Sequence, residues 1–185
     1  LSGGHSGEMI DKDKGNAIQL NVKLMHMLIK NGIDVRIVKI DGGLKDNAIA
    51  RECGCMFASE SSIEEIETII EKGFYAIKAQ YRKQEPHFSI ELNRCSANKA
   101  MNSSDSEAII NTVFLAPNGL IAKSKEIDGL TLISLNNGVI KTDDYKVEII
   151  YSLRSPIKGA LDELTDKIEM IASIYGLSIH VNSEY

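Results

Sequence analysis

Segments of helical periodicity alternate along this chain with segments of strand periodicity, and this alternation constrains the fold most strongly. Residues 17–31 carry apolar side chains around most of a helical circumference and leave only a narrow polar stripe. We expect Asp13 to cap this helix and Gly32 to end it. A helix that is apolar on most sides packs against several neighbours, so this one is predicted to lie at the centre of the fold.

The rest of the chain continues the alternation of helices and strands. The predicted elements are strands at 33–40 and 51–59, a helix from 62, a strand at 88–92, a loop at 95–105, a helix at 104–114, strands at 130–140 and 145–154 joined by a hairpin, a helix at 161–175 and a strand at 177–181. Adjacent strands flanked by helices are typical of split β-α-β units. We therefore expect an α+β two-layer sandwich of ferredoxin-like type, with two such units, 1–95 and 105–185, if the chain divides at the loop.

Composition narrows the classes of partner. Lys and Arg total 21 against 26 Asp and Glu, a net charge of −5, which argues against nucleic acid as a partner. No apolar run approaches the length of a membrane span, so no membrane partner is expected. Three cysteines are too few for a disulfide framework, and an odd number cannot all pair within the chain. This count indicates a reducing, cytoplasmic location. Cys53 and Cys55, on one face of a predicted strand, are interpreted as core residues.

Several motifs for chemistry are absent from the sequence. It contains no phosphate-binding loop, no nucleophile elbow and no helical pair of histidines for zinc, so no metal ligands are predicted. His26 falls on the polar stripe of the first helix and is expected to be solvated. His87 and His180 lie beside or within predicted strands, and we expect no chemical role for either.

His5 differs from the other histidines because it stands in Gly-Gly-His-Ser-Gly at residues 3–7. The glycines permit unusual dihedral angles and the close approach of a ligand. An imidazole in such a place can donate a hydrogen bond to a developing oxyanion. The alternative is a flexible turn in which the histidine is incidental.

Two further residues are candidates for substrate binding. Asn47 follows a glycine-rich turn at 41–46, where its amide can bind a substrate backbone or serve only the turn. Arg154 ends a predicted strand on the face opposite its apolar residues. Its guanidinium suits a carboxylate, and the alternative is a salt bridge at the rim of the domain.

These segments together resemble the lid domain of aminoacyl-histidine dipeptidases, also called Xaa-His dipeptidases or bacterial carnosinases. The resemblance rests on Gly-Gly-His-Ser-Gly at 3–7, Gly-Asn-Ala at 15–17, Gly-Gly-Leu-Lys-Asp-Asn-Ala-Ile-Ala-Arg-Glu at 42–52, Pro-Asn-Gly at 117–119, Ser-Leu-Asn-Asn-Gly-Val at 134–139 and Ser-Leu-Arg-Ser at 152–155. The matches keep their order over nearly the whole chain. Jointly they are specific, although any one alone would be weak.

The resemblance implies that residues 1–185 are a lid excised from a larger dinuclear zinc metallopeptidase, and the start at Leu1 agrees with this expectation. The two zinc ions, their ligands and the general base would belong to a catalytic domain outside this sequence. The fragment alone would then bind no cofactor and be inactive. The parent enzyme would hydrolyse Xaa-His and related dipeptides. The sequence leaves open whether it forms a homodimer through the lid.

The resemblance also assigns roles to the candidate residues. His5 matches the histidine that stabilises the tetrahedral intermediate, and Asn47 and Arg154 match residues that hold the substrate backbone and terminal carboxylate. Met9 stands where the family often has an acidic residue. Ala50 stands where many relatives have proline, which predicts a looser loop around Asn47. The alternative to the lid is a free-standing α+β binding or oligomerisation module without a catalytic role.

Overall fold

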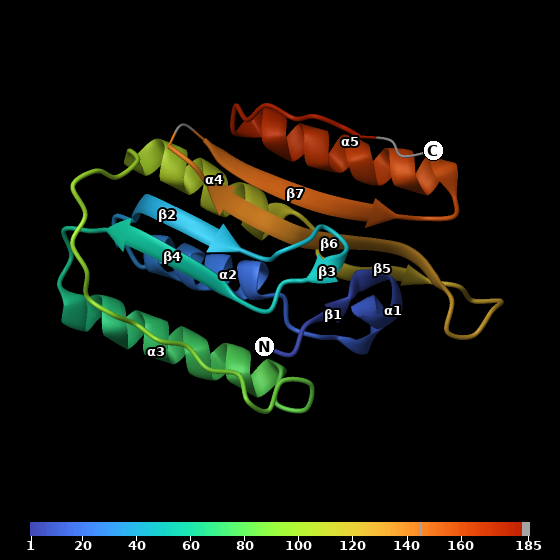
Figure 1. Cartoon of the computed structure of the whole chain (residues 1–185), viewed down its shortest axis with the longest axis horizontal. Helices are drawn as coiled ribbons and strands as arrows, with labels where there is room; N and C mark the ends of the chain where they lie inside the picture. Colours follow the sequence, from blue (N-terminus) through green and yellow to red (C-terminus); the bar gives the residue numbers. More distant parts are fainter. Residues whose placement is uncertain (145, 183–185) are drawn as a thin grey trace.

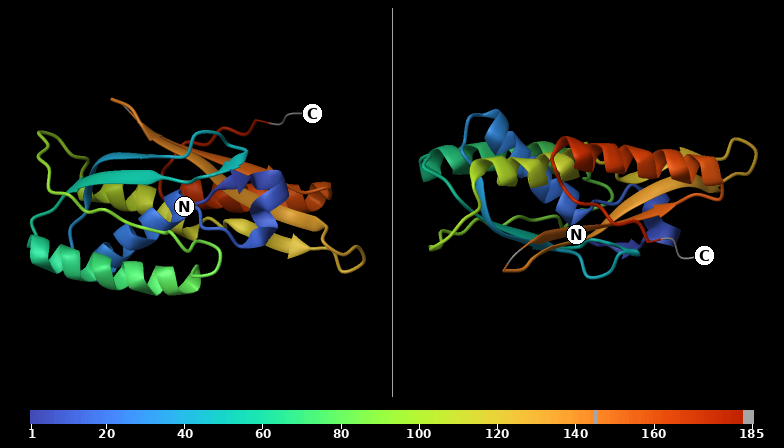
Figure 2. Two further views of the ribbon diagram at one scale, coloured as in Figure 1. Left: turned by 60° about the horizontal axis from the view of Figure 1, so that its bottom comes forward. Right: turned by 90° about the horizontal axis from the view of Figure 1, so that it is seen from above.

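A five-stranded antiparallel sheet with helices on one of its faces dominates the protein, and a small two-stranded sheet lies beside it (Figures 1 and 2). The structure is a computed structural model that describes residues 1–144 and 146–182. The right-hand view of Figure 2 shows the helices as one layer and the strands as the other. This arrangement confirms the predicted α+β class. No helix in the described ranges has the length and hydrophobicity that crossing a bilayer requires.

The element order is close to the predicted one. The elements are β1 (Gly4–His5), α1 (Ser6–Met9), a 3-10 turn η1 (Ile10–Lys12), α2 (Ala17–Lys30), β2 (Arg36–Gly42), β3 (Ala48–Ile49), β4 (Cys53–Ala58), α3 (Ile63–Gln80), α4 (Ser103–Leu115), β5 (Gly119–Lys123), β6 (Thr131–Thr142), β7 (Val147–Arg154) and α5 (Lys158–Ile174). Tyr145, the first residue of the strand predicted at 145–154, lies outside the described residues.

The long strand β6 joins the two halves of the sheet. It pairs along its length with β7, while β5 pairs with its first part and β2 meets it at Ile140. β4 completes the sheet on the far side of β2. All of these pairings are antiparallel. A separate two-stranded sheet, β1 with β3, brings the start of the chain against residues 48–49.

Helix α2 is the centre of the main core, as its apolar circumference predicts. Its side chains at Ile18, Val22 and Leu28 are fully buried, and the helix contacts α3, α4 and the strands β4 and β6. Gly32 follows the end of the helix with φ +84°, as expected. The predicted cap at Asp13 is wrong. Asn16 caps the helix through hydrogen bonds from Ile18 N and Gln19 N, because the chain turns at 13–15 before the helix begins.

Two predicted strands are not formed. Residues 88–92 and 177–181 alternate in polarity, but neither segment pairs with another strand among the described residues. Phe88 packs in the main core, whereas Ile90 and Leu92 are partly exposed. Conversely, no strand was predicted between the helix at 104–114 and the strand at 130–140, yet β5 forms there. Its five residues pair with β6, a long-range contact that a short apolar segment does not reveal.

Candidate functional site

The three candidate residues, far apart in the sequence, come together at the N-terminal segment of the chain. His5 on β1 lies opposite Ala48 on β3, the residue after Asn47. Ser6 donates its backbone N–H and its hydroxyl to the carbonyl of Asn47, at 2.9 and 3.1 Å. Residues 5–7 and the 42–48 turn therefore form one unit.

His5 is exposed and its ring has a defined hydrogen bond. The residue caps α1, and its Nδ1 accepts a hydrogen bond from Gly7 N–H at 3.2 Å. A ring nitrogen that accepts carries no proton, so neutral His5 has its proton on Nε2. The Nε2–H group is therefore available as a donor to a ligand.

Arg154 lies against the same glycine. A Cβ placed on Gly7 would lie 2.5 Å from Nη1 of Arg154 and 3.2 Å from both Nδ1 and Cε1 of His5. The guanidinium and the imidazole are thus neighbours on one side of the Gly7 backbone. Arg154 is exposed, and it forms no ion pair within the described part of the chain. The salt bridge weighed as its alternative role is not present there.

Asn47 is half-buried, and its backbone carbonyl ties it to the segment that carries His5. Its backbone N–H donates to the Asp46 carboxylate at 2.8 Å, while its side-chain amide makes no hydrogen bond to the residues that the structure describes. The loop is well held on its other side. Ala50 is 2% exposed and its carbonyl accepts from Ala17 N at 2.9 Å, whereas the looser loop expected from Ala50 stays a prediction.

A buried carboxylate that the sequence analysis missed fixes the segment that carries His5. Glu85 is 3% exposed and accepts from Ser2 N at 2.7 Å, Ser2 Oγ at 2.9 Å and Gly15 N at 3.3 Å. It therefore ties both ends of the 2–15 loop to the body of the domain. No local pattern signals this role, because Glu85 lies in irregular chain after α3.

The remaining histidines lie away from this site. His87 and His180 are exposed, and neither belongs to a metal-binding cluster among the described residues. The expectation that His26 is solvated is wrong. It is half-buried and stacks on Phe114 with ring centroids 3.8 Å apart, because α4 packs beside α2 and covers part of the polar stripe.

Cys53 and Cys55 pack against the main core, in line with their interpretation as structural residues. Burial raises the pKa of both thiols, that of Cys55 to about 12. Across residues 1–144 and 146–182, no cluster of three His, Cys, Asp or Glu side chains could hold a metal ion.

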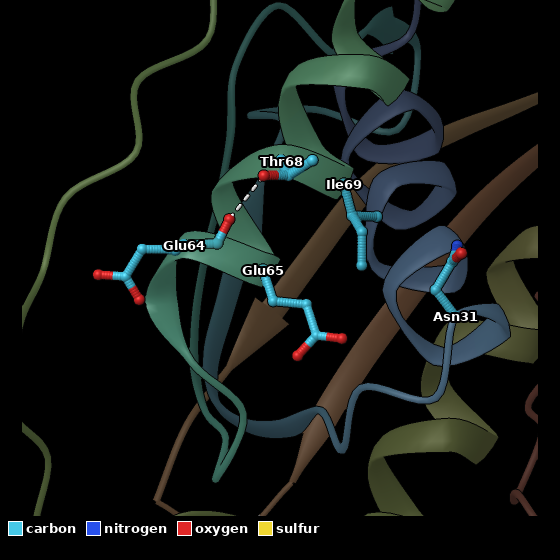
Figure 3. Close-up of a pocket in the computed structure, with 5 residues that line it drawn as sticks. All are labelled: Asn31, Glu64, Glu65, Thr68 and Ile69. Carbon is cyan, nitrogen blue, oxygen red and sulfur yellow. Dashed lines mark hydrogen bonds between the residues drawn. The ribbon is translucent and has the colours of Figure 1, made fainter.

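A groove on the surface is also distant from His5 in the fold. It has a volume of about 470 Å³ and lies between the end of α2 and the start of α3 (Figure 3). Asn31, Glu65 and Ile69 line it, and the Glu64 carboxylate points away from α2. The Thr68 hydroxyl donates to the Glu64 carbonyl within α3. The Glu64 carboxylate at its edge forms an exposed ion pair with Arg94 at 3.8 Å, so the groove adds nothing to the site around His5.

Comparison with known proteins gives two matches to dipeptidases. The chain is 26% identical over 187 residues to the cytosol non-specific dipeptidase of Escherichia coli (strain K12), covering 100% of this chain and 38% of that protein. It superposes on the crystal structure of aminoacylhistidine dipeptidase from Vibrio alginolyticus with a TM-score of 0.87 and 26% identity. That match covers 95% of this chain and 36% of the other. No family model matches the sequence.

The matches confirm the resemblance seen in the sequence motifs. Both relatives are dipeptidases, and in each the chain spans less than two-fifths of the protein's length. Over its own length the fold is shared almost completely. The chain is therefore a domain homologous to part of these dipeptidases, one of which is an aminoacylhistidine dipeptidase.

Proposed function

We propose that this chain is the substrate-covering lid of a metal-dependent dipeptidase that hydrolyses Xaa-His and related dipeptides. One observation carries the proposal. His5 and Arg154 lie on one side of Gly7, and Ser6, between His5 and Gly7, is hydrogen-bonded to the Asn47 carbonyl, so three distant segments meet here. Apart from His5 Nδ1, the polar ends of the three side chains make no hydrogen bond to other described residues. The proposal is supported by the fold shared with the crystal structure of an aminoacylhistidine dipeptidase and by the sequence similarity to a cytosol non-specific dipeptidase.

In this proposal each of the three groups binds a different part of the substrate. His5 donates from Nε2 to the oxygen of the peptide carbonyl as it becomes an oxyanion. Arg154 binds the terminal carboxylate through two parallel hydrogen bonds. Asn47 binds the substrate backbone with its amide, which offers both a donor and an acceptor.

The hydrolytic centre would lie outside this chain. The described residues provide no cluster of metal ligands, so they do not fit the two zinc ions of the proposed parent enzyme. This domain alone would contribute binding and transition-state stabilisation. A cytoplasmic location and a homodimer through this domain remain predictions.

Substitution of Arg154 by Lys in the full-length enzyme tests the binding role. Lysine keeps the charge but cannot form the bidentate pair. Charge-assisted hydrogen bonds contribute about 1.5–3 kcal/mol, so kcat/KM for free dipeptides should fall by roughly ten- to a hundredfold. Arg154 ends β7 and is exposed, so folding stability should barely change.

Dipeptides with an amidated C-terminus provide the control. They lack the carboxylate, so they should be poor substrates of the wild type, and Arg154→Lys should penalise them much less. Equal losses with free and amidated substrates would show that Arg154 does not bind the carboxylate. Such a result would favour the alternative, a binding module without a catalytic role.

A further inference from the structure

We propose that Asn136 is a positioning residue that holds Asn47 in place for the substrate. This inference rests on the proposed function, in which Asn47 binds the substrate backbone. Asn136 lies on β6, is 2% exposed and borders a small pocket, but its amide is engaged by other residues of the protein. Its effect would pass through the loop that it contacts.

The Asn136 amide binds the loop on both sides of Asn47. Its Nδ2 donates to the carbonyl of Asp46 at 2.7 Å and to the carbonyl of Ala48 at 2.9 Å. An amide nitrogen carries two hydrogens, so this one group is fully used by the two carbonyls. The peptide unit that leads into Asn47 and the one that follows Ala48 are thereby held on β6.

The acceptor end of Asn136 is used as well. Its Oδ1 accepts from Asn16 Nδ2 at 3.4 Å, and Asn16 also caps α2 and donates to the carbonyl of Asn137 at 2.8 Å. The residue that caps the central helix α2 thus binds the acceptor end of the Asn136 side chain. A side chain fixed at both ends can transmit the position of the sheet to the loop.

The backbone of β6 supports the same loop by close approach. A Cβ on Gly138 would collide with the backbone of Asp46, and a Cβ on Gly43, whose φ is +71°, would collide with the Gly138 carbonyl. Residues 136–138 therefore shape the loop by two independent contacts. The sequence motif at 134–139 therefore has a structural role, which is to support this loop.

Substitution of Asn136 by Leu, compared with Asn137 by Leu, tests the inference in the full-length enzyme. The two variants have the same change of shape on the same strand. Asn137 is fully buried, yet its side chain makes no hydrogen bond to any described residue, so Asn137→Leu leaves the loop contacts intact. A misplacement of about 1 Å can lower rates about 100-fold. Asn136→Leu should therefore lower kcat/KM by about ten- to a hundredfold, and Asn137→Leu by less than about threefold.

A double-mutant cycle with Asn47→Ala separates positioning from general damage. If Asn136 acts only through Asn47, the double variant should be no worse than Asn47→Ala alone. Independent, multiplying losses would overturn the inference, as would equal losses in Asn136→Leu and Asn137→Leu. If Asn136→Leu does not fold, Asn136→Ser serves instead. Its single hydroxyl hydrogen can bind only one of the two carbonyls.

Failure of the proposed function would look different. If Asn47→Ala keeps wild-type activity, Asn47 does not bind the substrate and Asn136 has no positioning role through it. This conclusion holds whether or not His5 and Arg154 bind the substrate. Faster hydrogen exchange at Ala48 N–H, which donates to Lys45 O at 3.2 Å, should accompany the loss of activity in Asn136→Leu. Unchanged exchange there would contradict the inference.

Discussion

Gly7 separates the two side chains on which the proposed chemistry depends. Its N–H orients the His5 ring, and its missing Cβ leaves room for the Arg154 guanidinium. The glycine does not have a positive φ, so its role here is space rather than backbone freedom. This site could not be assembled from the sequence without the resemblance, because no local pattern links residues 5, 47 and 154.

The substitution Gly7→Ala should therefore impair function without impairing folding. The added Cβ would meet the far end of the flexible Arg154 side chain, which can move away at little cost. We expect the free energy of unfolding to change by less than about 1 kcal/mol, since Ala suits a helical position better than Gly. The kcat/KM of the full-length enzyme should fall at least about tenfold. A variant with full activity would show that the His5–Arg154 arrangement is not required.

At the scale of the elements, periodicity predicted the helices better than the strands. Helix α3 begins after Ser62 as the capping box predicts, and α2 has the buried circumference expected of it. Residues 88–92 and 177–181 alternate like strands but find no partner, since pairing depends on distant chain. The contacts of Glu85 and Asn136 also join residues that are distant in the sequence, so they can be seen only in the structure.

Strand β4 provides a test of the core that needs no activity assay. Its two cysteines are packed against the main core, and burial raises the pKa of Cys55 to about 12, whereas Cys95 is exposed. The thiolate is the reactive form, so a negligible fraction of Cys55 can react at pH 8. A thiol reagent should label one cysteine per chain in native protein and three after denaturation. Rapid labelling of three in the native state would contradict the packing of β4.

At the scale of the whole molecule, a five-stranded antiparallel sheet carries the helices, and the described residues hold no cluster of three His, Cys, Asp or Glu side chains that could bind a metal ion. We therefore predict that the purified 185-residue chain neither retains stoichiometric zinc nor hydrolyses dipeptides. Metal analysis after dialysis and a dipeptide hydrolysis assay check this. About two tightly bound zinc ions per chain, or measurable turnover, would show that the domain has its own catalytic centre.

The role of His5 is the central claim, and the most direct measurement is kcat of the full-length enzyme carrying His5→Ala. Loss of one oxyanion donor typically lowers kcat by roughly 100- to 1,000-fold. His5 is exposed and contributes to no core, so zinc content and thermal stability should stay at wild-type values. A loss of that size with unchanged zinc would support the account. A loss of less than about threefold would contradict it and leave Gly-Gly-His-Ser-Gly as a structural turn.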